Sequence, residues 1–255
     1  MGVVRLSTLD ARNEELARMF GSAAPEAVQA YNSLLTLSWI HHDSALEGVV
    51  LSFPELRAAL DEGMISDVSL IPSYRDVQAH QRAIGVVRDL AAKRRTPITV
   101  ELVKRMYCAL TPEETDPRTL RFREEMPLHR LYFHEIAPTK KIEGRFVKLV
   151  EWINDPSTKA AIHPIRLAAR AHLKMLQIYP YTKNSGKLAR LLMNLLLMRS
   201  DYHPAIIHST ERQVYYESLR ASSHALTNIV MESLDNSMES ALRFLGEYAR
   251  VARSA

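Results

Sequence analysis

The sequence predicts an all-helical protein with a single domain. Apolar residues recur at helical spacing along nearly all of the 255 residues, only eight of which are glycine, and the alternating β-branched runs typical of strands are scarce. The chain is 47% hydrophobic and 24% charged, a globular composition whose length can bury one sizeable core. We expect one domain over residues 1–255, because no repeat, low-complexity segment or long linker divides it.

The helices are predicted from apolar spacing and from the residues at their ends. Pro164 suits the first turn of a helix, where its missing amide hydrogen would have no partner, and Pro97 and Pro112 separate other helices. The helix at 186–200 is apolar nearly all round, so it should lie in the middle of the fold. The predicted helices cover residues 12–20, 25–42, 54–62, 74–93, 98–110, 141–154, 164–178, 186–200, 211–226 and 237–252.

Residues 121–138 interrupt the helical pattern. Leu131, Tyr132 and Phe133 stand among polar residues without a helical stripe, which favours an irregular loop or a short β-hairpin. A long non-helical excursion in a compact helical domain is often functional.

Charge, cysteine content and the N-terminus exclude several classes of protein. The formal net charge is +4 without any run of five basic residues, so we expect no nucleic-acid partner. Cys108 is the one cysteine, which fits a reduced compartment. The N-terminus lacks the apolar stretch of a signal peptide, and the most apolar run, 191–198, is too short to cross a bilayer. We therefore expect a cytoplasmic protein without a membrane partner.

The segment 178–190 is a polar turn that leads into a buried helix. A helix N-terminus carries partial positive charge and binds anions, most naturally phosphate. Small residues at the turn tolerate unusual backbone angles and can point amides at a ligand: Asn184, Ser185 and Gly186. Full positive charges surround them: Lys183, Lys187 and Arg190. The segment predicts an anion site, and the structural alternative is an ordinary helix start with solvated lysines.

Residues 25–245 resemble the Fic family, which has the Fido fold. The loop resembles the family signature His-Pro-Phe-x-Asp/Glu-Gly-Asn-Gly-Arg-x-x-Arg. Four other segments resemble the corresponding parts of Fic sequences: 168–172, 189–194, 202–207 and 215–219. Family members transfer AMP, or occasionally another phosphate-containing group, from a nucleotide to a protein hydroxyl. The resemblance implies a Fido helical domain with a short β-hairpin flap, ATP or another nucleotide as ligand, and a protein target or regulatory partner. The fold also allows a homodimer.

Several positions of the loop depart from the family signature. The histidine that is the family's general base falls on Tyr179, and the carboxylate that holds magnesium falls on Lys183. The family's first glycine, asparagine and first arginine fall on Asn184, Ser185 and Lys187. The signature's other named residues are matched or conservatively replaced by Pro180, Tyr181, Gly186 and Arg190.

These departures change the expected chemistry. A free tyrosine has a pKa near 10, so only about one in a thousand is ionised at neutral pH, and losing a general base costs about 10² to 10⁴ in rate. Lys183 cannot bind magnesium, which needs oxygen ligands, but its ammonium could neutralise a phosphate. We interpret the chain as a divergent member that binds a nucleotide or phosphate while AMP transfer is impaired or absent.

Two alternatives remain open. In the first, the protein is an active transferase of AMP or another phosphate-containing group, with Tyr179 or a nearby histidine as base or nucleophile and Lys183 replacing the metal. In the second, it is a non-catalytic protein-interaction scaffold. We expect no metal site from the consecutive His41, His42 and Asp43, because neighbouring residues on a helix point in different directions.

Two other segments resemble parts of the family. Residues 43–48, within an inhibitory-helix-like segment at 41–48, resemble the motif Ser/Thr-x-x-x-Glu-Gly/Asn, with Asp43 at the hydroxyl position. The resemblance implies that Glu47 is inhibitory and pairs with Arg190; the alternative is a surface glutamate before a helix-ending glycine. Residues 121–138 fall where the family has a flap that docks the target by strand addition, which would involve Leu131, Tyr132 and Phe133. A packed loop is the alternative there.

Overall fold

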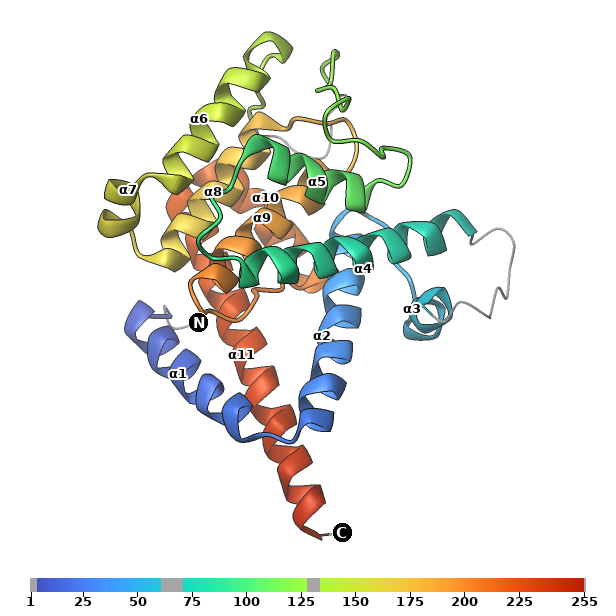
Figure 1. Ribbon diagram of the computed structural model, residues 1–255, viewed down its shortest axis with the longest axis vertical. Helices are drawn as coiled ribbons and strands as arrows, with labels where there is room; N and C mark the ends of the chain where they lie inside the picture. Colours follow the sequence, from blue (N-terminus) through green and yellow to red (C-terminus); the bar gives the residue numbers. More distant parts are fainter. Residues whose placement is uncertain (1–3, 61–70, 128–133, 255) are drawn as a thin grey trace.

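The computed structural model describes residues 4–60, 71–127 and 134–254, and within them it contains helices but no strand (Figure 1). The prediction of an all-α fold is therefore confirmed. The helices are α1 (Leu6–Ser22), α2 (Pro25–Leu46), α3 (Phe53–Leu60), α4 (Ile71–Ala92), α5 (Val100–Leu110), α6 (Ile142–Asn154), α7 (Pro156–Ala161), α8 (Pro164–Ile178), α9 (Ser185–Arg199), α10 (Arg212–Ala221) and α11 (Ser223–Ser254), with short 3-10 turns η2 (Thr139–Lys141) and η3 (Ser209–Glu211).

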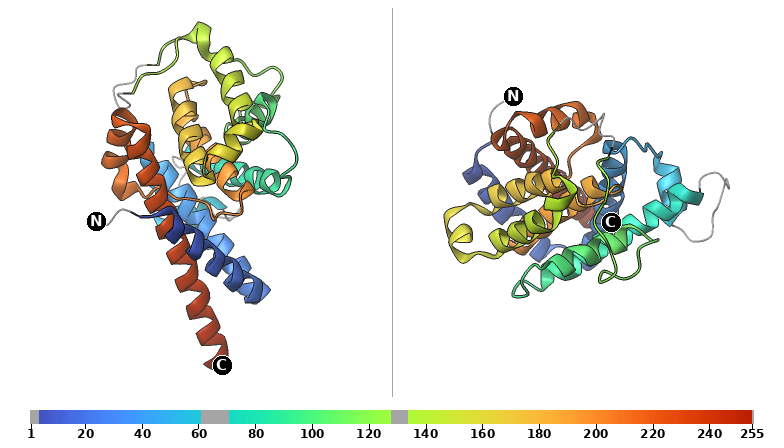
Figure 2. Two further views of the ribbon diagram at one scale, coloured as in Figure 1. Left: turned by 90° about the vertical axis from the view of Figure 1, so that its left-hand side faces the viewer. Right: turned by 90° about the horizontal axis from the view of Figure 1, so that it is seen from above.

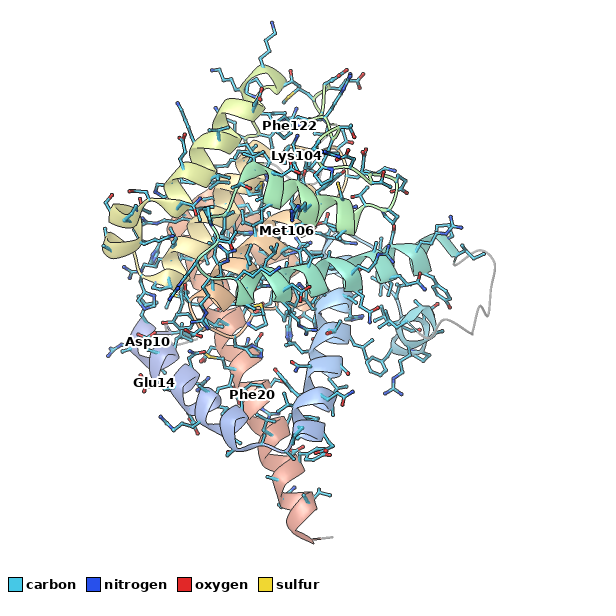
Figure 3. All side chains as sticks on the ribbon, in the orientation of Figure 1. Asp10, Glu14, Phe20, Lys104, Met106 and Phe122 are labelled. Atoms are coloured by element: carbon cyan, nitrogen blue, oxygen red, sulfur yellow. The ribbon has the colours of Figure 1, made fainter. Side chains whose placement is uncertain are left out.

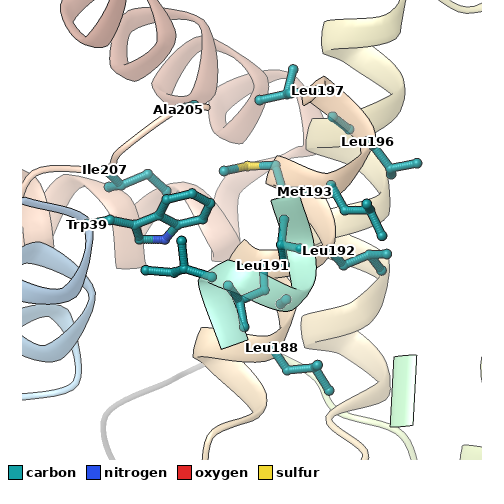
Figure 4. Packing of buried hydrophobic residues seen from close by; sticks show 14 of the residues in the cluster. Trp39, Leu188, Leu191, Leu192, Met193, Leu196, Leu197, Ala205 and Ile207 are labelled. Carbon is teal, nitrogen blue, oxygen red and sulfur yellow. The ribbon is translucent and has the colours of Figure 1, made fainter. Parts of the chain in front are cut away.

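Helix α9 lies in the middle of the fold, as its apolar sequence predicts. Every residue from Ser185 to Leu197 is buried, and α9 packs on α8, α4 and α5. Figure 4 shows Trp39 of α2, Ile207 and Met193 among the side chains that pack at this centre. Because burying one large apolar side chain contributes about 1.5–3 kcal/mol, this helix anchors the loop that precedes it.

Helix α11 forms the long axis of the molecule. It has 32 residues and packs on α1, α8, α10 and α2, and its C-terminal end extends beyond the other helices (Figure 1 and Figure 2, left). Although α11 is long, neither it nor any other described helix combines the length and apolar character needed to span a bilayer.

Most predicted helix ends are shifted by a few residues, and two differences are larger in kind. Helix α7 was not predicted; it begins at Pro156, where the Asp155 carboxylate accepts hydrogen bonds from the Ser157 and Thr158 amides. The predicted break at 227–236 is wrong, because α11 begins at Ser223, one residue after Ser222, whose hydroxyl accepts a hydrogen bond from the Ala225 amide at 3.1 Å. A side-chain cap of this kind starts a helix without any proline or glycine.

The expected flap is described only at its two ends. Residues 121–127 and 134–138 form no strand, while Leu131, Tyr132 and Phe133 lie outside the described residues, so their role in target docking stays a prediction. Phe122 lies over α5, with the ammonium of Lys104 5.2 Å from its ring centroid (Figure 3). This contact fixes the start of the segment to the helical core.

Candidate functional site

The loop between α8 and α9 is held in shape by its own backbone and by Ser185. Tyr179 ends α8 in the left-handed conformation (φ 47°), and Asn184 precedes α9 with φ 57°. The Ser185 hydroxyl donates to the Tyr181 carbonyl at 2.7 Å and accepts from the Tyr181 amide at 3.0 Å. The Ser185 hydroxyl is thus engaged within the loop, and the predicted anion-binding role of Ser185 stays a prediction.

Arg123 ties this loop to both ends of the segment that resembles the flap. Its Nε donates to the Tyr179 carbonyl at 2.7 Å, and its backbone amide donates to the Pro180 carbonyl at 2.9 Å. Its guanidinium also donates to the carbonyls of Glu125 and Ala137. Since a buried guanidinium with several carbonyl partners is costly to move, Arg123 holds the loop against Glu125 and Ala137.

Arg190, in the second turn of α9, binds the carboxylates of Asp43, in the last turn of α2, and of Glu47, directly after α2. Its Nε donates to Asp43 Oδ1 at 2.7 Å, and one terminal nitrogen donates to Glu47 Oε1 at 2.8 Å and to the Asp43 carbonyl at 3.3 Å. The Arg190 side chain is only 2% exposed. Burial alone would lower the pKa of Arg190, but Asp43 and Glu47 raise it well above its ordinary value. The contact predicted between Glu47 and Arg190 is therefore present.

The Glu47 carboxylate lies directly on the first turn of α9. A Cβ placed on Gly186 would be 2.2 Å from Glu47 Oε1 and 3.4 Å from an Arg190 terminal nitrogen, so glycine is needed for this approach. Lys187 is 7% exposed; burial lowers the pKa of its ammonium, while the charges of Glu47 and Asp43 oppose that shift. A carboxylate thus occupies the helix N-terminus at which the sequence predicts a phosphate.

The end of α2 that carries Glu47 is held by α10. The Leu46 carbonyl accepts hydrogen bonds from Arg212 Nε and from the Tyr216 hydroxyl, both at 2.9 Å. Gly48 then turns the chain with φ 92°. These contacts satisfy a carbonyl that the helix end leaves without a partner, and they place Glu47 over α9.

Asp43 connects this cluster to His80 of α4, a residue that sequence reasoning missed. Asp43 Oδ2 lies 3.3 Å from His80 Nε2, and both side chains are almost fully buried. Burial chiefly lowers the pKa of His80, so its ring is mainly neutral at pH 7. Burial would raise the pKa of Asp43, but Arg190 and His80 lower it to about 2. Asp43 is therefore a charged second partner of Arg190.

Other predicted site residues lie around the cluster rather than in it. Lys183 is exposed, and no ion pair joins it to another described residue. The Asn184 amide donates to the Thr111 hydroxyl at 3.1 Å. Tyr179 is 7% exposed, and burial, with Glu47 adding to it, raises the pKa of its hydroxyl. The catalytic and anion-binding roles of these residues stay predictions.

The histidines of α8 and α2 have structural partners. His172 is fully buried with Nε2 2.9 Å from the Tyr215 hydroxyl, and burial lowers its pKa to about 3. His42 stacks on His208 at 4.2 Å between ring centroids, and its Nδ1 accepts a hydrogen bond from the Ser209 amide. Neither arrangement brings a histidine to the Tyr179 position.

The donor set at this loop does not fit magnesium. Lys183 presents an ammonium where the resemblance places a carboxylate, and the two nearby carboxylates, Asp43 and Glu47, are both paired with Arg190. Magnesium needs oxygen ligands, and an ammonium supplies none.

Replacing Tyr181 by phenylalanine is expected to raise the free energy of unfolding by about 1 kcal/mol, because a buried hydroxyl without a partner is costly. The Tyr181 ring is 3% exposed and stacks on Tyr107 at 3.8 Å, and its hydroxyl has no hydrogen-bond partner among the described residues. Urea denaturation measures the change. Tyr107→Phe is the matched control and should destabilise, since the Tyr107 hydroxyl hydrogen-bonds the Thr111 side chain. A Tyr181→Phe protein less stable than the native chain would contradict the prediction.

Comparisons with known proteins agree on one family. The profile described as the Fic/DOC family matches residues 97–197. The protein adenylyltransferase fic-1 of Caenorhabditis briggsae is 31% identical over 186 residues, which cover 72% of this chain and 36% of that protein. The protein adenylyltransferase Fic of Drosophila mojavensis is 26% identical over 239 residues, which cover 86% of this chain and 42% of the relative. The chain therefore spans less than half the length of these relatives.

Solved structures show the same architecture. The structure of Fic-1 from C. elegans superposes with a TM-score of 0.78 at 26% identity, over 95% of this chain and 72% of that one. A Fic-domain signalling protein of Bacteroides thetaiotaomicron superposes with a TM-score of 0.81 at 20% identity, over 94% of this chain and 97% of that one, which shows the fold alone. Together with the loop at 179–190, these matches show that the chain belongs to the Fic/DOC family.

Proposed function

We propose that this protein binds a nucleotide, or another phosphate-bearing ligand, at the loop from Tyr179 to Arg190, and that its transfer of AMP to proteins is impaired or absent. A nucleotide is proposed as the ligand because relatives of the chain are named protein adenylyltransferase. The positions of Lys187 and Arg190 at the start of α9 support the place at which it binds.

The contact of Glu47 with Gly186 and Arg190 carries the proposal. The first turn of α9 already holds an anion there, a carboxylate of the same chain. A phosphate of an incoming ligand would need the same backbone and the same guanidinium. Ligand and Glu47 therefore compete, and α2 restrains the site from within the chain.

Impaired transfer follows from the chemistry at two positions. The group at the place of the general base is the Tyr179 hydroxyl, whose pKa burial raises further above its ordinary value near 10. The group at the place of the metal ligand is the exposed ammonium of Lys183. Neither can do what a neutral imidazole and a carboxylate do for phosphoryl chemistry.

Asp43 limits how much positive charge the site offers. Lys187 and Arg190 supply two positive charges, and Asp43 and Glu47 supply two negative charges. Removal of Glu47 leaves these groups with a net charge of +1, because the negative charge of Asp43 still neutralises that of Arg190. We therefore expect the site to attract one phosphate group rather than to neutralise a whole triphosphate.

Replacing Glu47 by glycine is expected to tighten ATP binding by about tenfold or more, equivalent to about 1.4 kcal/mol, because the competing carboxylate is gone. Titration calorimetry with ATP measures the affinity, with and without magnesium, and we expect magnesium to make little difference. Glu47→Gln is the matched variant that keeps the side chain over Gly186 but removes its charge.

The ATP affinities of the native chain, Glu47→Gly and Glu47→Gln distinguish nucleotide binding from a scaffold function. Tighter binding in both variants indicates competition through charge, and tighter binding in Glu47→Gly alone indicates a steric block. Absence of ATP binding in all three proteins would contradict both nucleotide-based functions and would favour a protein-interaction scaffold.

A further inference from the structure

Helices α6 and α8 form a pocket of about 270 Å³ beside the candidate site. Arg145, Lys148 and Trp152 of α6 line one side, and Lys174 and Gln177 of α8 line the other. The Lys174 ammonium lies 5.1 Å from the centroid of the Trp152 ring. The pocket thus combines an aromatic surface with three cations.

The positive charge of this pocket is not balanced locally. No carboxylate of the described residues lines it, and no ion pair joins Arg145, Lys148 or Lys174 to another of them. Glu143 and Glu151 share helix α6 but do not line the pocket. Like charges held together without counter-charges attract an anionic partner.

The position of the pocket connects it with the candidate site. Its α8 wall ends at Gln177 and Ile178, directly before Tyr179. The Gln177 carbonyl accepts a hydrogen bond from the Ala137 amide at 2.7 Å, and His134 Nε2 lies 3.2 Å from the Leu176 carbonyl. The pocket therefore borders the segment 134–138, which returns from the flap position to the core.

We propose that this pocket binds an acidic segment of a partner protein, an interaction that goes beyond the proposed function. A guanidinium can hold a carboxylate through two hydrogen bonds, and ammonium groups add point charges. The Trp152 face packs against the peptide chain beside those carboxylates. Exposed ion pairs are individually weak and are screened by salt, so several together give weak, salt-sensitive binding suited to a transient partner.

A decaglutamate peptide tests this inference directly. Trp152 is half-buried, whereas Trp39, the other of the two tryptophans, is 1% exposed, so a change in tryptophan emission reports on the α6–α8 pocket. We expect a saturable change, absent in Trp152→Phe, while the anisotropy of a labelled peptide still shows that Trp152→Phe binds. Raising the salt from about 50 mM to about 500 mM should weaken binding, since the Debye length shortens.

Charge reversal gives the decisive comparison. Arg145→Glu combined with Lys174→Glu should weaken peptide binding at least tenfold, whereas Lys93→Glu, at an exposed lysine beyond α4, should not. ATP binding by the Glu47→Gly protein should be unchanged by these reversals, so failure of one site is distinguishable from failure of the other. No peptide binding, equal binding after charge reversal, or equally strong competition by inorganic phosphate would overturn the inference.

Discussion

Replacing Arg190 by alanine is expected to lower the free energy of unfolding by about 3–5 kcal/mol, because it leaves a buried carboxylate without its cation. Asp43 is 2% exposed and receives the Arg190 Nε at 2.7 Å. Its neighbour His80 is mainly neutral and supplies no permanent charge in compensation. Urea denaturation at pH 7 measures the loss.

The pH dependence of that loss identifies its cause. In the native chain the pKa of Asp43 is held at about 2, below its ordinary 3.8, so the ion pair stabilises the fold above about pH 4 and this contribution is lost as the pH falls toward 2. Without Arg190, the buried Asp43 carboxylate has no permanent cation beside it. Binding of one proton, shared by Asp43 and His80, then lowers the cost of burying that charge. The folded variant then binds a proton more tightly than the unfolded chain, and its deficit should shrink between about pH 8 and pH 5.

Two matched variants test this assignment. Arg243→Ala removes a guanidinium from an exposed pair with Glu239 and should cost less than about 1 kcal/mol. Asp43→Asn in the Arg190→Ala background removes the stranded charge and should recover part of the stability. If Arg190→Ala costs no more than Arg243→Ala, the buried pair does not stabilise this fold.

The cluster around Arg190 was only partly predictable from the sequence. The pairing with Glu47 followed from the resemblance of residues 43–48, but Asp43 was treated as a departure and not as a second partner. The signal was available, since residues four apart on a helix share a face, and Asp43 and Glu47 are four apart at the end of α2. His80 had no such signal, because only the packing of α4 on α2 and α9 brings it to Asp43.

Helix ends marked by a proline were predicted well, whereas the helix starts capped by Asp155 and Ser222 were missed. Helix α8 has the predicted bounds because Pro164 begins it and the left-handed Tyr179 ends it. The start of α11 depends on one serine hydroxyl, and several serines nearby could have served equally. The contacts of Ser185 could not be predicted either. A small polar residue can face a ligand or hydrogen-bond its own loop, and the sequence does not distinguish the two.

Replacing Tyr179 by histidine is expected to raise AMP transfer by about 10² to 10⁴, provided that Glu47→Gly has opened the site. A histidine of ordinary pKa is mostly a neutral base at pH 7, whereas burial keeps the Tyr179 hydroxyl protonated. The backbone permits the exchange, since histidine is among the residues enriched at positive φ and Tyr179 has φ 47°.

The matched variants decide which function the loop retains. Pyrophosphate release from ATP and incorporation of labelled AMP into protein are measured in Glu47→Gly and in Glu47→Gly/Tyr179→His, each with and without Lys183→Asp. Because an aspartate can bind magnesium, we expect the highest rate with both changes and magnesium present. Rapid transfer by Glu47→Gly alone would contradict impaired catalysis and favour altered chemistry. Loss of that activity in Glu47→Gly/Tyr179→Phe would then assign the reaction to the Tyr179 hydroxyl.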